Sequence, residues 1–132
     1  MRTFVVPLDG SKPAEAALHV AHRVAQNIGG ELCLVRVSPP DEAKADAAYL
    51  EAMAATIGGM PVSTMVVAVE PGERVSAGII RAVEASGPNA VLCLTLRGHS
   101  ALETALVGST AEDLLRDYDR PILVAPLGRP SG

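Results

Sequence analysis

Short apolar runs alternate with helical segments along this chain, and that alternation is the feature that most constrains its fold. The runs are rich in Val, Ile and Leu and have few polar interruptions, which is typical of strands buried on both faces. Turn residues such as Gly and Pro separate them from the helical segments. Strands are predicted over Thr3–Leu8, Glu31–Val37, Val62–Val69, Ala90–Leu94 and Pro121–Ala125.

Helices are expected between these strands. The first has Pro13 in its opening turn and ends near Gly29 and Gly30, which are typical start and stop signals. The others are predicted over Asp41–Ile57, Glu73–Ala85 and Ser109–Asp117. Strict alternation of strand and helix indicates an α/β fold, in which helices cover both faces of a parallel sheet.

Connection rules narrow this to a doubly wound architecture. The 132 residues suffice for one core, so we expect a single domain over residues 1–132, with residues 128–132 as a flexible tail. Right-handed crossovers favour a five-stranded parallel sheet in the order 3-2-1-4-5. The winding then reverses between strands 1 and 4, whose carboxyl ends, Leu8-Asp9 and Leu94-Thr95, frame a crevice.

Composition argues against several classes of partner. A net charge of −4 and an aromatic content of 2% provide neither a basic footprint nor stacking platforms, so we expect no nucleic-acid partner. The apolar runs are too short to span a membrane. The first run also meets a proline and an acid where a secretory signal would continue, so we expect a cytoplasmic protein.

Two residue pairs suggest reactive sites but have simpler explanations. Cys33 and Cys93 fall within apolar runs and are expected to be small buried hydrophobes. The predicted strand order separates them by one strand, or roughly 9 to 10 Å, which is beyond disulfide reach. His19 and His22 share a helix face, but without a third ligand we expect no metal held by the protein alone.

The segment between the last two predicted strands is suited to holding an anion. Gly108 lies just before Ser109, which opens a helical pattern with Glu112 three residues on, a capping box. Free N–H groups and the positive end of the helix dipole favour phosphate at such a position. Arg97 and His99 could neutralise a phosphate here or remain solvated loop residues.

Catalysis at this segment is not favoured. It contains no lysine, so it is not a Walker A loop, which requires Gly-Lys-Ser/Thr. No residue is placed as a general base for a γ-phosphate, so at most slow hydrolysis of ATP is expected.

Asp9 is expected to face the same crevice from the end of the first strand. Its carboxylate could accept hydrogen bonds from a ribose hydroxyl. Alternatively, Asp9 and Ser11 cap the following helix. The arrival of the glycine-bearing segment at the same crevice favours the ribose.

Three stretches together resemble the universal stress protein family over essentially the whole chain. They are Val5–Ser11, the spacing Gly98-x9-Gly108-Ser109, and Arg120–Ala125. Nucleotide-binding members of that family carry Gly-x2-Gly-x9-Gly followed by Ser or Thr. Thr95 stands in place of the first glycine, and a β-branched residue is a poor substitute where glycine's freedom is needed. Its hydroxyl could instead meet a phosphate oxygen.

The resemblance implies a regulatory protein that binds ATP or a related adenine nucleotide, with any Mg²⁺ carried by the nucleotide. Asp9 would meet the ribose, and the backbone at Val37 would read the adenine edge. The other implied site residues are Gly98, Gly108, Ser109 and Thr110 at the phosphates, Pro7, Leu8 and Leu94 at the base and sugar, and Thr95, Arg97 and His99 within the same segment.

The resemblance also implies a homodimer joined through the last strand, Pro121–Ala125. That strand is apolar and would lie at a sheet edge, a surface that needs a partner. A dimeric stress-response scaffold of the same fold, without a ligand, is therefore an alternative function.

A more remote alternative is a receiver-type phosphoacceptor domain, which is another doubly wound fold. Asp9, Glu70 and Thr95 would mark the ends of strands 1, 3 and 4. That chemistry requires an acid cluster, an acceptor aspartate and a lysine after the last strand, whereas this chain has Pro126 there.

Overall fold

Five parallel strands form one sheet in the computed structural model, which describes residues 2–10, 12–96 and 118–126. The sheet order is β3-β2-β1-β4-β5, which confirms the predicted topology. The strands are β1 (Thr3–Pro7), β2 (Glu31–Ser38), β3 (Val62–Ala68), β4 (Ala90–Leu96) and β5 (Ile122–Pro126). The described helices are α1 (Lys12–Ile28), α2 (Ala43–Ala55) and α3 (Val75–Ala85), with a 3-10 turn, η1 (Pro40–Glu42), before α2.

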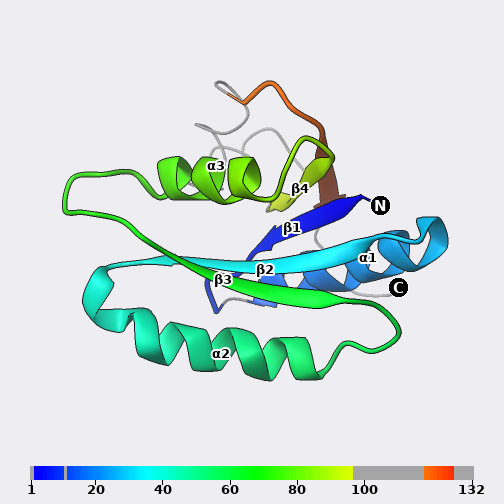
Figure 1. Ribbon diagram of the computed structural model, residues 1–132, viewed down its shortest axis with the longest axis horizontal. Coiled ribbons are helices and arrows are strands. Elements are labelled where there is room, and N and C mark those ends of the chain that lie inside the picture. The colour runs from blue at the N-terminus through cyan, green and yellow to red at the C-terminus, as the bar shows by residue number, and fades with distance from the viewer. Residues whose placement is uncertain (1, 11, 97–117, 127–132) are drawn as a thin grey trace.

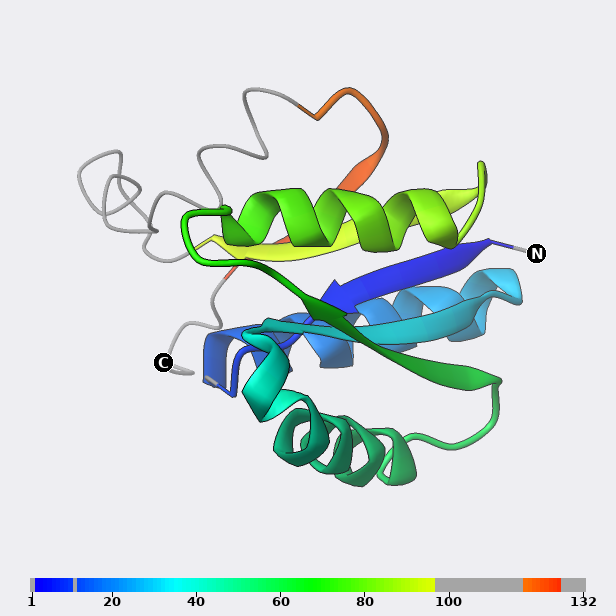
Figure 2. The same cartoon turned by 60° about the vertical axis from the view of Figure 1, so that its left-hand side comes forward.

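The helices cover both faces of the sheet. Figure 2 shows α3 on one side and α1 and α2 on the other, and Figure 1 shows the same layers from a second direction. Because strand side chains alternate between faces, the interior divides into two clusters. The α1/α2 core includes Phe4, Val6, Leu8, Leu18, Leu34 and Leu50. The α3 core includes Val5, Val35, Ile79, Val83, Leu92 and Leu94.

The helices form where apolar residues recur with helical spacing. In α1 the buried residues Leu18, Ala21 and Ala25 fall on one face, toward the sheet. The helix ends at Ile28, and the next residue, Gly29, has a φ of +75°, the left-handed conformation that commonly closes a helix. None of the helices in these ranges is long and apolar enough to cross a bilayer.

Several element boundaries differ from the predicted ones, in one case because of a local hydrogen bond. The helix predicted over Asp41–Ile57 is divided into η1 and α2. The next helix begins at Val75 rather than Glu73, because the Glu73 N–H closes a turn by donating to the Glu70 carbonyl at 2.9 Å. The fourth strand continues past Leu94 to Leu96. The predicted helix 109–117 lies outside the described residues.

The two cysteines lie on opposite faces of the sheet. Cys33 belongs to the α3 core and Cys93 to the α1/α2 core, with β1 between their strands. Both are buried free thiols, as predicted.

Candidate functional site

The sheet divides at its carboxyl edge between β1 and β4. Pairing of β1 with β2 extends to Pro7↔Val35, and pairing of β4 with β5 extends to Leu96↔Pro126. Between β1 and β4, however, the paired register ends at Val5↔Leu92. Beyond this point, β1 remains paired with β2, and β4 remains paired with β5. The separation falls where the winding of the sheet reverses, which is where ligands of doubly wound folds bind.

Pro7 gives a physical reason for this division. The Leu8 N–H donates to the Val35 carbonyl of β2 at 2.7 Å. Because backbone groups of successive strand residues point to opposite neighbours, those of Val5 and Pro7 face β4. Proline has no N–H. The chain thus lacks the donor that would continue the ladder from β1 to β4 beyond Val5.

Asp9 follows immediately, exposed at the turn that leads from β1 into α1. Gly10 comes next with a φ of +85°, a conformation that side chains rarely adopt. The residue predicted to meet a ribose is thus exposed, just past the point where β1 and β4 stop pairing.

Three other predicted site residues, Val37, Leu94 and Leu8, pack in or against the two core clusters. Val37 lies on the α3 side of β2, where a Cβ built on Gly78 would stand only 2.8 Å from its Cγ1, so the missing side chain lets α3 approach closely. Leu94 belongs to the same core. Leu8 is only 2% exposed and belongs to the α1/α2 core, so its side chain is not available to a ligand.

Most of the segment predicted to hold an anion lies outside the described residues. Arg97, Gly98, His99, Gly108, Ser109 and Thr110 lie outside the described residues. Thr95 is within β4, paired with Ala125 of β5. The position that resembles the first glycine of the motif therefore lies within a strand.

Arg36, which the sequence did not single out, lies next to the Asp9 turn. Its Nε is 3.2 Å from Asp46 Oδ1, and its Nη1 donates a long hydrogen bond of 3.4 Å to the Leu8 carbonyl. The guanidinium carbon lies 5.5 Å from the centroid of the Tyr49 ring, within the range of a cation–π contact. The available sequence signal was a charged residue inside an apolar strand run.

Tyr49 extends this group of residues to α1. Its hydroxyl donates to Glu15 Oε2 at 2.8 Å, which joins α2 to α1. Burial raises the pKa of Tyr49 to about 12, and the hydrogen bond to Glu15 acts in the same direction. The β1–α1 turn, β2, α1 and α2 are thus connected by polar contacts.

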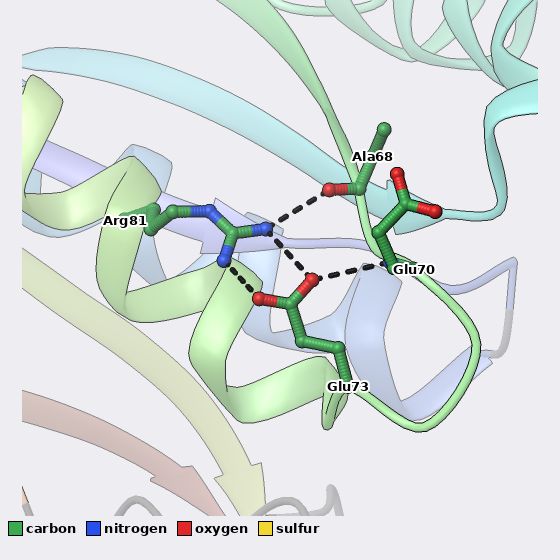
Figure 3. A network of polar contacts seen from close by, with 4 residues as sticks. All are labelled: Ala68, Glu70, Glu73 and Arg81. Carbon is green, nitrogen blue, oxygen red and sulfur yellow. Dashed lines mark hydrogen bonds and ion pairs between the residues drawn. The ribbon is translucent and has the colours of Figure 1, made fainter.

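A second arginine holds the connection between β3 and α3. Arg81 Nη2 donates to the Ala68 carbonyl at 2.9 Å, and the same guanidinium pairs with Glu73, as Figure 3 shows. Glu73 Oε1 in turn accepts a hydrogen bond of 3.1 Å from the Glu70 N–H. The hydrogen bond from Arg81 lowers the pKa of the Glu73 carboxyl.

The strand order argues against the receiver alternative. Receiver domains place their third strand beside the first, in the order 2-1-3-4-5. Here β3 is an edge strand with β2 between it and β1, so Glu70 and Asp9 follow strands that are not neighbours. Within the part of the chain that the structure describes, no three His, Cys, Asp or Glu residues gather in a way that could hold a metal ion.

Comparison with known proteins gives a consistent picture. A family model described as the universal stress protein family matches residues 1–126. A universal stress protein family member from Burkholderia pseudomallei is 27% identical, with a TM-score of 0.71 over 94% of this chain and 95% of that one. One from Archaeoglobus fulgidus DSM 4304 is 27% identical with a TM-score of 0.75, over 96% of this chain and 45% of that one.

A third solved structure is a universal stress protein in complex with cAMP. It is 19% identical, with a TM-score of 0.73, over 96% of this chain and 98% of that one, a likeness of fold. No curated protein matches the chain.

Proposed function

The chain belongs to the universal stress protein family, and from that premise we propose that it binds ATP or a related adenine nucleotide between the carboxyl ends of β1 and β4. The observation that carries the proposal is the end of β1–β4 pairing at Val5↔Leu92, directly before the exposed Asp9. A protein of the same fold was solved in complex with cAMP, an adenine nucleotide, which adds support.

The described residues suggest how the nucleoside would be held. The Asp9 carboxylate accepts hydrogen bonds from the ribose hydroxyls. The β2 backbone at Val37 meets the adenine edge, and Pro7 and Leu94 border the base and sugar. This arrangement uses strand ends that the core holds in place, which limits the conformational entropy lost on binding.

The phosphates are assigned to the segment that follows β4. Gly98, Gly108, Ser109 and Thr110 would offer backbone N–H and hydroxyl donors, with Arg97 and His99 as charged neighbours. Any Mg²⁺ would arrive with the nucleotide. Because no residue is placed by sequence as a base for the γ-phosphate, we expect the nucleotide to be held with little or no hydrolysis, as in a regulatory protein.

Native mass spectrometry of freshly purified protein, followed by calorimetric titration with ATP and Mg²⁺, tests the proposal. We expect an adenine nucleotide mass in the first experiment or saturable binding in the second. Absence of both at millimolar ATP would contradict the proposal and favour the ligand-free dimeric scaffold.

Two variants test the phosphate assignment. Gly108→Val should abolish binding by blocking the close approach of the backbone to phosphate. Thr95→Gly should strengthen binding by restoring the glycine of the motif. Undiminished affinity in Gly108→Val would show that this segment does not hold the phosphates.

A further inference from the structure

Arg36 lies near the carboxyl end of β2 and is held by an ion pair, a hydrogen bond and a cation–π contact. Its side chain is 25% exposed, and that of its partner Asp46 is 11% exposed, so the ion pair is largely shielded from water. Asp46 lies in the first turn of α2, where the helix dipole favours a negative charge. The aromatic ring of Tyr49 lies beside the guanidinium at 5.5 Å, and Glu15 fixes the Tyr49 hydroxyl.

Such a shielded pair needs an explanation other than stability. Desolvating two charges costs about as much as their attraction returns, so apolar residues of similar size often serve a fold equally well. The two ends of this guanidinium have different partners. One end is fixed on α2 through Asp46, and the other reaches the turn that follows β1.

The contacts at that second end are with backbone. Arg36 Nη1 donates to the Leu8 carbonyl at 3.4 Å, and the position of a Cβ on Gly10 would be 3.5 Å from the same nitrogen. The guanidinium therefore lies against the residues on either side of Asp9. The negative charge of Asp9 also acts on Tyr49, because it contributes to raising the pKa of that side chain.

We propose that Arg36 is a positioning residue, anchored on α2 by Asp46 and Tyr49, which holds the Leu8–Gly10 turn so that Asp9 is presented to the ribose. This inference rests on the proposed nucleotide site. Arg36 acts through the backbone around Asp9 and needs no contact with the nucleotide.

The first test concerns the turn in the nucleotide-free protein. In ¹⁵N relaxation measurements, the order parameters of the Asp9 and Gly10 amides should lie near the value for rigid backbone, about 0.85, and should fall below about 0.6 in Arg36→Met. Because Arg36→Met leaves Asp46 without its partner, Arg36→Met/Asp46→Asn is measured beside it and should give the same loss of order.

Arg81→Met is the matched control. Arg81 also joins a carboxylate to a strand-end carbonyl, that of Ala68, but at the β3–α3 connection. It should leave the order parameters of Asp9 and Gly10 unchanged. Unchanged values in both Arg36 variants, or an equal loss in Arg81→Met, would overturn the inference whether or not the protein binds ATP.

The second test is a double-mutant cycle on ATP affinity. Arg36→Met should weaken ATP binding about tenfold, as expected for coupled neighbours. In an Asp9→Ala background the same change should weaken binding by less than about twofold, because the carboxylate that Arg36 positions is absent. Losses that multiply would show that Arg36 acts independently of Asp9 and would overturn the inference. Absence of ATP binding in the unsubstituted protein would contradict the proposed function, while the relaxation test still decides the role of Arg36.

Discussion

Burial makes Cys93 a neutral core residue. It packs in the α1/α2 core at 2% exposure, and desolvation raises the pKa of its thiol to about 12. The nucleophilic thiolate is therefore suppressed at physiological pH, so Cys93 serves the fold as a small hydrophobe.

The raised pKa predicts a loss of stability at alkaline pH. Between the ordinary thiol value of 9.0 and about 12, the folded protein retains a proton that the unfolded chain has released. The free energy of unfolding should therefore fall as pH rises through this window, by at most about 1.4 kcal/mol per pH unit from this group. Tyr49, whose pKa is also raised to about 12, adds to the fall above pH 10.

Urea unfolding at pH 8, 9 and 10 measures this effect. Cys93→Ala should show a shallower decline than the unsubstituted protein, each compared with its own stability at pH 8. Identical slopes in the two proteins would contradict the assignment of the decline to Cys93.

At the scale of elements, α3 approaches β2 closely because residue 78 is glycine. A Cβ there would lie 2.8 Å from Val37 Cγ1 and 3.1 Å from Val69 Cγ1, and valine side chains have little rotamer freedom to give way. Gly78 thus fixes the spacing between α3 and the strand whose backbone is proposed to meet adenine.

Gly78→Ala should therefore destabilise the protein, by about 1–3 kcal/mol as for other overpacked cores. A glycine-to-alanine change within an exposed helix ordinarily raises the free energy of unfolding by about 1 kcal/mol. A decrease in Gly78→Ala would therefore indicate close packing at this position. Gly58→Ala is the control, since nothing lies within 4 Å of that position, and it should change stability by less than about 0.5 kcal/mol. Chemical denaturation measures both, and a Gly78→Ala protein more stable than the original would refute the close-packing explanation.

Pro7 also shapes the arrangement of elements, because it lacks the N–H donor that would continue the β1–β4 ladder. In Pro7→Ala, the amide at position 7 gains the chance to bond to β4 and should be protected from hydrogen exchange. ATP affinity should fall as the strand ends close. Exchange at that amide at the rate of an exposed loop would mean that something other than the missing N–H separates the strands.

The strand order can be predicted from the sequence, whereas exact element boundaries and long-range polar contacts cannot. Near-continuous Val, Ile and Leu runs are sufficient for the strand order, because burial on both faces and right-handed crossovers leave few topologies. Turn bonds such as Glu73 to Glu70 shift boundaries without changing the apolar pattern. The Arg36–Leu8 hydrogen bond joins residues 28 apart along the chain, and the Tyr49–Glu15 bond joins residues 34 apart, so no local pattern reports them.

At the scale of the whole molecule, β5 (Ile122–Pro126) is an edge strand of the sheet. An apolar edge strand presents unpaired backbone groups to a neighbouring chain. We propose that two copies of the chain associate through this edge.

A charge on this strand tests the dimer. Leu123 packs against the α1/α2 core, so a charge there would also disturb the interior. Val124→Glu should give monomer or aggregate in sedimentation velocity where the original gives dimer, and its unfolding midpoint is measured beside it to separate a lost interface from a disturbed interior. An unchanged dimer would place the interface elsewhere.

The position of the nucleotide is tested most directly by ¹H–¹⁵N spectra recorded during titration with ATP. We expect the largest shift changes at Leu8, Asp9 and Gly10, at Val37, and at Leu94 to Leu96, where the β1–β4 ladder has ended. Amides of the outer strand β3, such as those of Ser63 and Thr64, should not move. Shift changes centred away from the β1 and β4 carboxyl ends, or none at millimolar ATP, would contradict a nucleotide site at this point of the sheet.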